Sequence, residues 1–263
     1  MKKLPPLQTI KVGGLVWRII ETPGTKNGPV LFMLPGTLGT AAIFEAAMLE
    51  LGTRVRMVSV TYPMIEDILR LADSLAGLMD KLGITRASLV GSSLGGFLAQ
   101  HFAARHADRV DKLILGNTLC DPHLTRRVVE RMPVDALRAQ PAQAHRDMVV
   151  NSVRSWPETD PLGKKLKTIL IDSGTRLLSA RAMKARVLAV QAAPAVPALA
   201  IGGERITIID CEDDPLLPRA VQDDVVRRYP GARHVRLSSG GHYPNILRTK
   251  DYNATLRQAL DIG

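Results

Sequence analysis

A serine lies in a glycine-rich turn that joins an apolar run to a helical pattern. Residues 87–100 read ASLVGSSLGGFLAQ, which places Ser93 at the centre of a Gly-x-Ser-x-Gly pattern. In a tight turn from strand to helix, a side chain at Gly91 or Gly95 would collide with the backbone. The same turn directs the first helical N–H groups, beginning with that of Leu94, toward the oxygen of a bound substrate. The pattern predicts that Ser93 is a nucleophile, and the alternative is a serine in a structural turn.

A serine hydroxyl needs a general base to act as a nucleophile at neutral pH. His242 follows the last expected strand in a glycine loop, SSGGHYP at 238–244, which can bring an imidazole back over a sheet. We therefore expect His242 to be the base, with a solvent-facing loop histidine as the alternative. The other histidines fall on expected helices or at a strand start: His101, His106, His123, His145 and His234.

The base in turn needs an acid that holds its ring. The segment DCEDDPLLP at 210–218 follows an expected strand and offers four carboxylates. Its two prolines close a turn that favours Asp214 as the fixed, buried acid, whereas Glu212 and Asp213 can stay in water. Crowded carboxylates would also raise one another's pKa unless some are exposed. The other candidates are Asp213 as the main alternative, Asp210 at the strand end, Glu212 in water, and Asp121 beyond an earlier strand.

Short apolar runs alternate with helical patterns along the chain. Residues 64–82 carry apolar side chains on one helical face, and Gly83 is placed to end that helix. Runs that are apolar on both faces are typical of a covered parallel sheet. We predict a mostly parallel, doubly wound α/β sheet. Its expected strands are an opening hairpin at Ile10–Ile20 and the runs Val30–Leu34, Val55–Thr61, Ser88–Val90, Lys112–Leu115, Ile206–Ile209 and His234–Leu237.

The alternation stops between residues 123 and 203, where short amphipathic helical patterns follow one another. This predicts a helical cap inserted into a core of residues 1–122 and 204–263. Thirteen basic and six acidic residues lie between Thr125 and Arg186, so about +7 of the total +10 belongs to the cap. Such a field attracts anionic substrates or a negatively charged surface, but a solvated helix face explains it equally well. Candidates for an apolar pocket wall, or alternatively for cap core, are Met132, Leu137, Met148, Trp156, Leu162 and Leu166.

Composition and motifs exclude several classes of protein. The chain is 46% hydrophobic and 4% aromatic, its basic residues are scattered, and we expect no nucleic-acid partner. No apolar run reaches the roughly 20 residues that cross a bilayer, and no export signal follows the basic start. We expect a cytoplasmic protein without a membrane span, in which Cys120 and Cys211 are reduced thiols. No phosphate loop, dinucleotide fingerprint or metal-ligand spacing occurs, so no cofactor or metal is expected.

The order Ser93, Asp214, His242 is that of the α/β-hydrolase superfamily, which this chain resembles over nearly its whole length. The resemblance implies the α/β-hydrolase fold and a second oxyanion donor from the loop LPGTLG at 34–39. Within that loop the Thr37 N–H matches the family pattern best, followed by Leu38, and the first donor is the Leu94 N–H. Two positions depart from the pattern: Pro35 stands where a His is usual, and Cys211 where such loops generally have Gly.

The resemblance implies a serine hydrolase, most simply a carboxylesterase acting through an acyl-enzyme on a small ester-like substrate. A carbon–carbon or thioester bond remains open, whereas a serine nucleophile argues against dehalogenase and epoxide-hydrolase chemistry. Within the superfamily, residues 62–63 (YP), 93–100 (SLGGFLAQ), 229–233 (YPGAR) and 240–241 (GG) resemble the maspardin family. That family has an incomplete triad and is regarded as a group of binding or adaptor proteins. Because this chain keeps a candidate at all three positions, we expect an enzyme.

Overall fold

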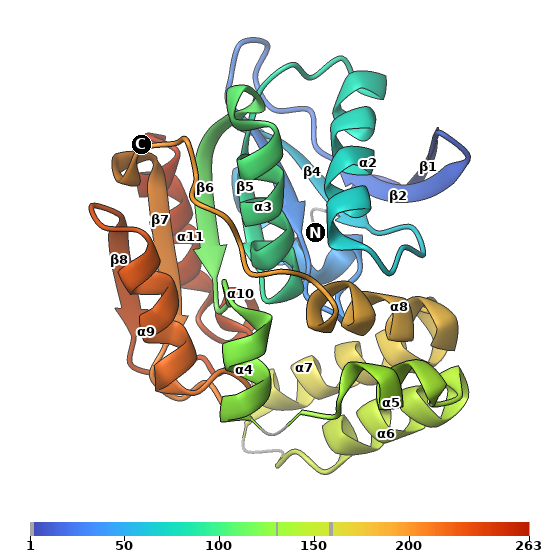
Figure 1. The fold of residues 1–263 in the computed structure, drawn as a ribbon. Coiled ribbons are helices and arrows are strands. Elements are labelled where there is room, and N and C mark those ends of the chain that lie inside the picture. Colours follow the sequence, from blue (N-terminus) through green and yellow to red (C-terminus); the bar gives the residue numbers. More distant parts are fainter. Residues whose placement is uncertain (1–2, 130, 158–159, 263) are drawn as a thin grey trace.

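An eight-stranded sheet runs through the molecule (Figure 1). The computed structural model describes residues 3–129, 131–157 and 160–262. The strands lie in the order β1-β2-β4-β3-β5-β6-β7-β8; β1 and β2 form an antiparallel hairpin, β2 is antiparallel to β4, and the other pairs are parallel. This confirms the predicted fold class. The strands are β1 (Gln8–Val12), β2 (Leu15–Glu21), β3 (Val30–Leu34), β4 (Arg56–Thr61), β5 (Ala87–Ser92), β6 (Val110–Gly116), β7 (Ile206–Cys211) and β8 (Arg233–Leu237).

Helices cover both faces of the sheet, and alternate strand residues serve the two layers. Phe32 and Leu34 belong to the apolar cluster that includes α2, α3 and α9, whereas Leu31 and Met33 belong to the cluster of α1 and α11. In Figure 1, α2 and α3 lie in front of the sheet and α11 lies behind it. These helices are α1 (Glu45–Leu51), α2 (Ile68–Lys81), α3 (Leu94–Arg105), α9 (Arg219–Arg228), α10 (Pro244–Leu247) and α11 (Thr249–Ala259), with short 3-10 turns at Ala41–Phe44, Ala107–Arg109 and Gly203–Arg205.

The helix predicted over residues 64–82 begins four residues later than expected. The Asp67 side chain accepts the N–H groups of Leu69 and Arg70, at 2.8 and 3.0 Å, and so caps α2 at its first turn. The apolar pattern extends in front of this cap because Ile65 is buried in the core from a loop rather than from the helix. Periodicity alone cannot distinguish the two cases.

Five α-helices follow β6 and precede β7 within residues 117–129, 131–157 and 160–205, and we call them the cap helices. They lie beyond the carboxyl ends of the strands, at the bottom of Figure 1. No strand interrupts them in the part of this segment that the structure describes. The division of the chain at residues 123 and 203 remains a prediction. The cap helices are α4 (Pro122–Val128), α5 (Val134–Ala139), α6 (Ala142–Arg154), α7 (Pro161–Asp172) and α8 (Ala180–Gln191), with a π-helical turn at Ser173–Leu177 between the last two.

Both cysteines are buried free thiols, so the chain forms no bridge between Cys120 and Cys211. Among the described residues, no helix has the length and apolar character that crossing a membrane requires. In the same residues, His, Cys, Asp and Glu side chains do not gather in groups of three or more that could hold a metal ion.

Candidate active site

The turn at Ser93 is a strained strand-to-helix junction. Ser93 has φ 55° and ψ −119°, a conformation that L-residues rarely adopt. Its N–H donates to the carbonyl oxygens of Gly116 and Asn117, at 3.0 and 3.1 Å, which ties the turn to the end of β6. A Cβ at Gly91 would lie 2.2 Å from the Gly95 carbonyl oxygen. The predicted need for glycine on both sides of Ser93 is therefore confirmed.

We predict that Gly95→Ala destabilises the protein by about 3 kcal/mol or more, because overpacking against backbone has no flexible side chain to yield. A Cβ at Gly95 would lie 1.8 Å from the Leu34 carbonyl oxygen and 2.8 Å from that of Pro35, so β3 and the following loop must move. Urea unfolding monitored by circular dichroism measures the change. An unfolding midpoint equal to that of the unmodified protein would contradict this packing.

A buried carboxylate holds the His242 ring. His242 Nδ1 donates to Asp214 Oδ2 at 2.8 Å, and the two side chains are 6% and 0% exposed. This contact assigns the ring proton to Nδ1, because a carboxylate only accepts, and it leaves Nε2 as the acceptor. The other carboxylate oxygen of Asp214 accepts the N–H groups of Leu216 and Leu217, at 2.8 and 3.2 Å. These contacts fix the Asp214 side chain within the turn after β7, and its role as the acid remains a prediction.

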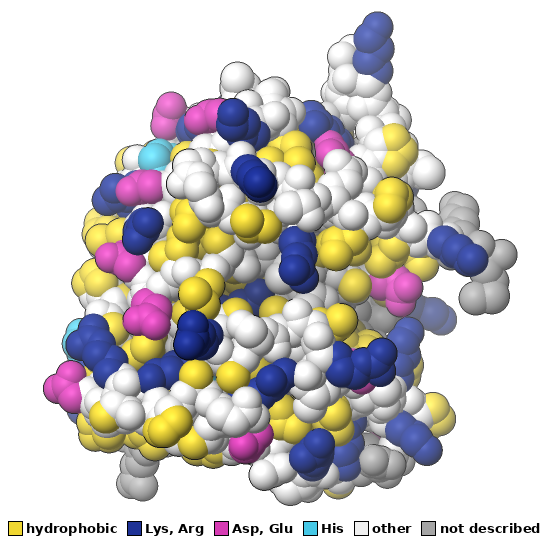
Figure 2. Space-filling view, turned by 90° about the vertical axis from the view of Figure 1, so that its right-hand side faces the viewer, with side chains coloured by type: hydrophobic (Ala, Val, Ile, Leu, Met, Phe, Trp, Pro, Cys, Tyr) yellow, Lys and Arg dark blue, Asp and Glu magenta, His cyan; other side chains and the backbone are white. Residues whose placement is uncertain are grey.

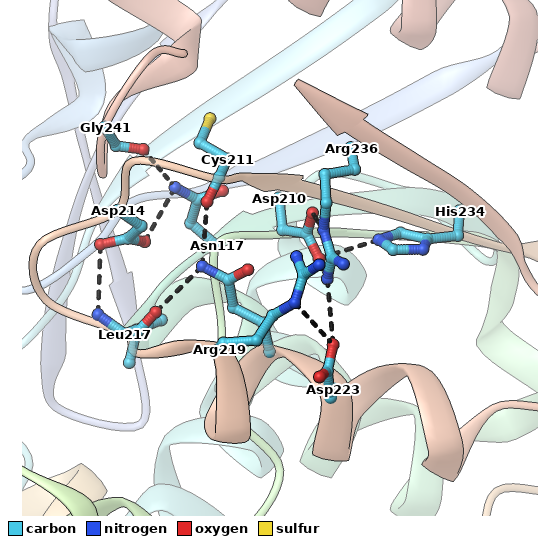
Figure 3. Close-up of polar contacts among 11 residues, drawn as sticks. Asn117, Asp210, Cys211, Asp214, Leu217, Arg219, Asp223, His234, Arg236 and Gly241 are labelled. Carbon is cyan, nitrogen blue, oxygen red and sulfur yellow. Dashed lines mark hydrogen bonds and ion pairs between the residues drawn. The ribbon is translucent and has the colours of Figure 1, made fainter. Parts of the chain in front are cut away.

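Asn117 joins the acid to the histidine loop, and sequence reasoning missed it. Its Nδ2 donates to Asp214 Oδ2 at 2.9 Å and to the Gly241 carbonyl oxygen at 2.6 Å (Figure 3). Asn117 directly follows β6 and has φ 34°, a conformation that Asn tolerates better than most residues. An asparagine at the carboxyl end of a buried strand was the available signal.

The remaining carboxylates have other partners. Asp213 is exposed, as expected, and it accepts the N–H groups of Gly240 and Gly241, at 3.2 and 2.8 Å, so it also supports the histidine loop. Asp210 is buried in β7 and pairs with Arg236 and His234 (Figure 3). Glu212 is exposed, as expected, and Asp121 caps α4 through the His123 N–H.

Ser93 and His242 line one cavity of about 370 Å³ beneath the cap helices. In the described chain, no hydrogen bond joins the Ser93 hydroxyl to the His242 ring, a common arrangement before a substrate tightens the site. Of the six expected wall residues, Met148 and Trp156 contribute, whereas Leu137 and Leu166 are buried in the cap and Met132 and Leu162 lie outside the lining. The lining residues are Thr37, Leu38, Ser93, Arg131, Met148, Val149, Ser152, Val153, Trp156, Leu216, His242 and Tyr243.

The loop after β3 is held from behind by hydrogen bonds to its carbonyl groups. The Tyr62 hydroxyl donates to the Pro35 carbonyl oxygen at 2.8 Å. Arg186 of α8 donates through Nη1 to the carbonyl oxygens of Thr37 and Gly39, at 3.0 and 2.7 Å. Burial lowers the pKa of Arg186 to about 10, and its guanidinium stacks 5.0 Å above the Tyr62 ring. A cap helix thus positions the loop that carries Thr37, and this arginine was not singled out from the sequence.

The expected oxyanion donors lie on the two elements that meet at Ser93. Thr37 lines the cavity, as does its alternative Leu38. Leu94 is the first residue of α3, so its N–H is among those that the helix leaves without an intrahelical acceptor.

Burial raises the pKa of the Tyr243 hydroxyl well above its usual value and that of the Cys211 thiol to about 12. Both groups therefore stay neutral beside His242 and Asp214 at neutral pH.

Comparison with known proteins assigns the family. The family described as "alpha/beta hydrolase fold" matches residues 65–249. This chain belongs to that family. It is 28% identical to maspardin from Homo sapiens over 242 residues, which cover 90% of this chain and 77% of that protein. The α/β-hydrolase fold and the similarity to maspardin that the sequence motifs predicted are both confirmed.

Two solved structures show the same fold. One is an enol-lactonase from Burkholderia xenovorans, with a TM-score of 0.78, 20% identity and coverage of 97% of this chain and 100% of that chain. The other is a thermophilic esterase from Thermogutta terrifontis, with a TM-score of 0.74, 21% identity and coverage of 97% and 98%. At these identities the likeness concerns the fold alone.

Proposed function

We propose that the protein is a serine hydrolase that cleaves carboxylic esters with Ser93 as nucleophile, His242 as base and Asp214 as the acid that orients the base. The observation that carries this proposal is the buried Asp214–His242 hydrogen bond, 2.8 Å long, at a cavity that Ser93 also lines. Membership of the α/β-hydrolase family supports it, as do the esterase and lactonase among the structures with the same fold.

In this mechanism each side chain has one task. The Ser93 hydroxyl attacks the ester carbonyl carbon while His242 Nε2 takes its proton and passes it to the departing alcohol oxygen. The Thr37 and Leu94 N–H groups stabilise the negative oxygen of the tetrahedral intermediate. Water then attacks the acyl-enzyme, His242 takes its proton and returns it to Ser93, and the carboxylic acid leaves. Asp214 stabilises the imidazolium that forms in both halves of the reaction.

The similarity to maspardin favours a second candidate, a binding or adaptor protein that keeps the hydrolase fold without turnover. The site residues weigh against it, because a binding surface needs neither the strained turn at Ser93 nor a buried carboxylate on His242. Strain of this kind persists only where the surrounding structure holds it, and it clusters at functional sites. We therefore place the hydrolase first.

A panel of p-nitrophenyl esters with acyl chains of graded length tests the proposed function. The cavity of about 370 Å³ lies near the lower end of the roughly 300–1,000 Å³ that ligand pockets span, and its lining is mostly apolar. We expect turnover with the highest kcat/KM for short acyl groups and a decline as the chain outgrows the cavity. Folded protein that turns over no ester of the panel above the rate of the buffer would contradict ester hydrolysis and favour the adaptor.

A further inference from the structure

Of the described residues that line the cavity at Ser93, one carries a permanent charge, and it is Arg131. The residue lies between α4 and α5, where its N–H donates to the Arg126 carbonyl oxygen at 3.2 Å. The rest of the lining is apolar or carries hydroxyl and imidazole groups, with no Asp or Glu among the described lining residues. Any ligand that enters this cavity therefore meets a cation within a mostly apolar wall.

The Arg131 guanidinium has no hydrogen-bond or ion-pair partner among the residues that the structure describes. Burial lowers the pKa of this guanidinium below its usual value, which reflects its partial removal from water. Three other half-buried or buried cap cations donate to backbone carbonyl oxygens: Arg146, Lys184 and, through Nη1, Arg186. Arg131 differs from them, since its donors remain available to a ligand.

A partly desolvated cation without a partner is unfavourable, and an anionic group in the cavity would relieve that cost. Guanidinium matches a carboxylate with two parallel hydrogen bonds. One cation balances one negative charge, so a carboxylate fits this site better than a phosphate dianion. The surrounding cap points the same way: the lower half of Figure 2, where the cap lies, shows more Lys and Arg than Asp and Glu.

We propose that Arg131 binds a second, non-reacting carboxylate of the substrate, so that the preferred substrates are half-esters of dicarboxylic acids or lactones that carry a free carboxylate. This inference rests on the proposed ester hydrolysis and names its substrate class. It gives one of the cap cations a function in place of the solvated-face explanation. Substrate is held at its distant end by Arg131 while its ester carbonyl lies at Ser93.

Matched pairs of esters test the proposal. Mono-p-nitrophenyl esters of succinic, glutaric, adipic and pimelic acids are each compared with the alkanoate ester in which a methyl group replaces the free carboxylate. For the best spacer length we expect the ratio of the two kcat/KM values, half-ester over neutral ester, to fall about 10- to 100-fold in Arg131→Met. Arg131→Lys retains the charge and should keep part of the preference.

Arg181→Met is the matched control, because it removes one exposed arginine from α8 outside the cavity lining. We expect it to leave the ratio unchanged, since an exposed charge acts weakly through water and salt. The same ratio in Arg131→Met as in the unmodified protein would overturn the proposal. So would an equal fall in Arg181→Met, which would show that only the overall charge of the cap matters.

A binding measurement separates this inference from the proposed function. Trp156 lines the cavity, whereas Trp17 is fully buried on β2 with its Nε1 bonded to Ser74, so tryptophan fluorescence reports on the site. In Ser93→Ala we expect glutarate or adipate to change this signal, and added Arg131→Met to weaken binding at least about tenfold. Binding that depends on Arg131 without any ester turnover would contradict the proposed hydrolase function and support the carboxylate site. Ester turnover without such binding would contradict only the proposed carboxylate site.

Discussion

Ser93→Ala should lower kcat/KM for p-nitrophenyl esters by at least about 10⁴-fold, because it removes the atom that forms the acyl-enzyme. The residual rate would come from the N–H groups of Thr37 and Leu94 and from binding alone. The substitution removes one oxygen from a side chain at the cavity wall, so the fold should persist. Initial rates with the best ester of the panel, beside a thermal unfolding curve, measure both quantities.

Ser92→Ala is the matched control for this experiment. Ser92 is the last residue of β5 and neighbours Ser93 in the chain, but it does not line the cavity. We expect its kcat/KM to stay within about threefold of the unmodified protein, as for a substitution away from the reacting atoms. Comparable losses in the two variants, or turnover that survives in Ser93→Ala, would remove Ser93 from the mechanism.

Asp214→Asn should lower kcat by about 10⁴-fold while the protein remains folded. The carboxylate now accepts from His242 Nδ1, from Asn117 Nδ2 and from two backbone N–H groups. An amide would remove the negative charge that stabilises the imidazolium. Its NH₂ group would also favour the ring tautomer with the proton on Nε2, which cannot accept the Ser93 proton. Steady-state kinetics at saturating ester measures the loss.

Asp213→Asn is the comparison that separates the two adjacent acids. Asp213 contacts the N–H groups of Gly240 and Gly241 but not the His242 ring. We expect a loss of less than about tenfold, since an amide oxygen can still accept one of these hydrogen bonds. A larger loss of kcat in Asp213→Asn than in Asp214→Asn would assign the orienting acid to Asp213 and contradict the role proposed for Asp214.

Local sequence patterns were sufficient to predict the fold, the turn at Ser93 and the choice of Asp214. The glycines around Ser93 show in sequence because the strained turn tolerates no Cβ there, and the structure places the expected clash at Gly91 and Gly95. Apolar runs locate the strands because a covered parallel sheet buries both faces. The choice of Asp214 over its neighbours follows from a turn that two prolines stiffen.

Residues that act through tertiary contacts could not be identified from the sequence. Asn117 and Arg186 reach their partners across 97 and 149 positions of the chain, and neither type of side chain is distinctive by itself. Arg131 was one of thirteen cap cations until the fold showed which of them lines the cavity. Two of the six expected wall residues line the cavity, for the same reason. Periodicity shows which side chains lie on the apolar face of a helix, but not which cavity that face lines.

Covalent labelling with a fluorophosphonate tests the central claim most directly. The reagent reacts with a serine that a general base activates, next to N–H groups that bind the phosphonyl oxygen. We predict one phosphonyl group per chain by intact mass, located on Ser93 by peptide mapping, and absent from Ser93→Ala. Labelling should slow strongly in Asp214→Asn. Folded protein that takes up no label, or label on a different residue, would contradict the account.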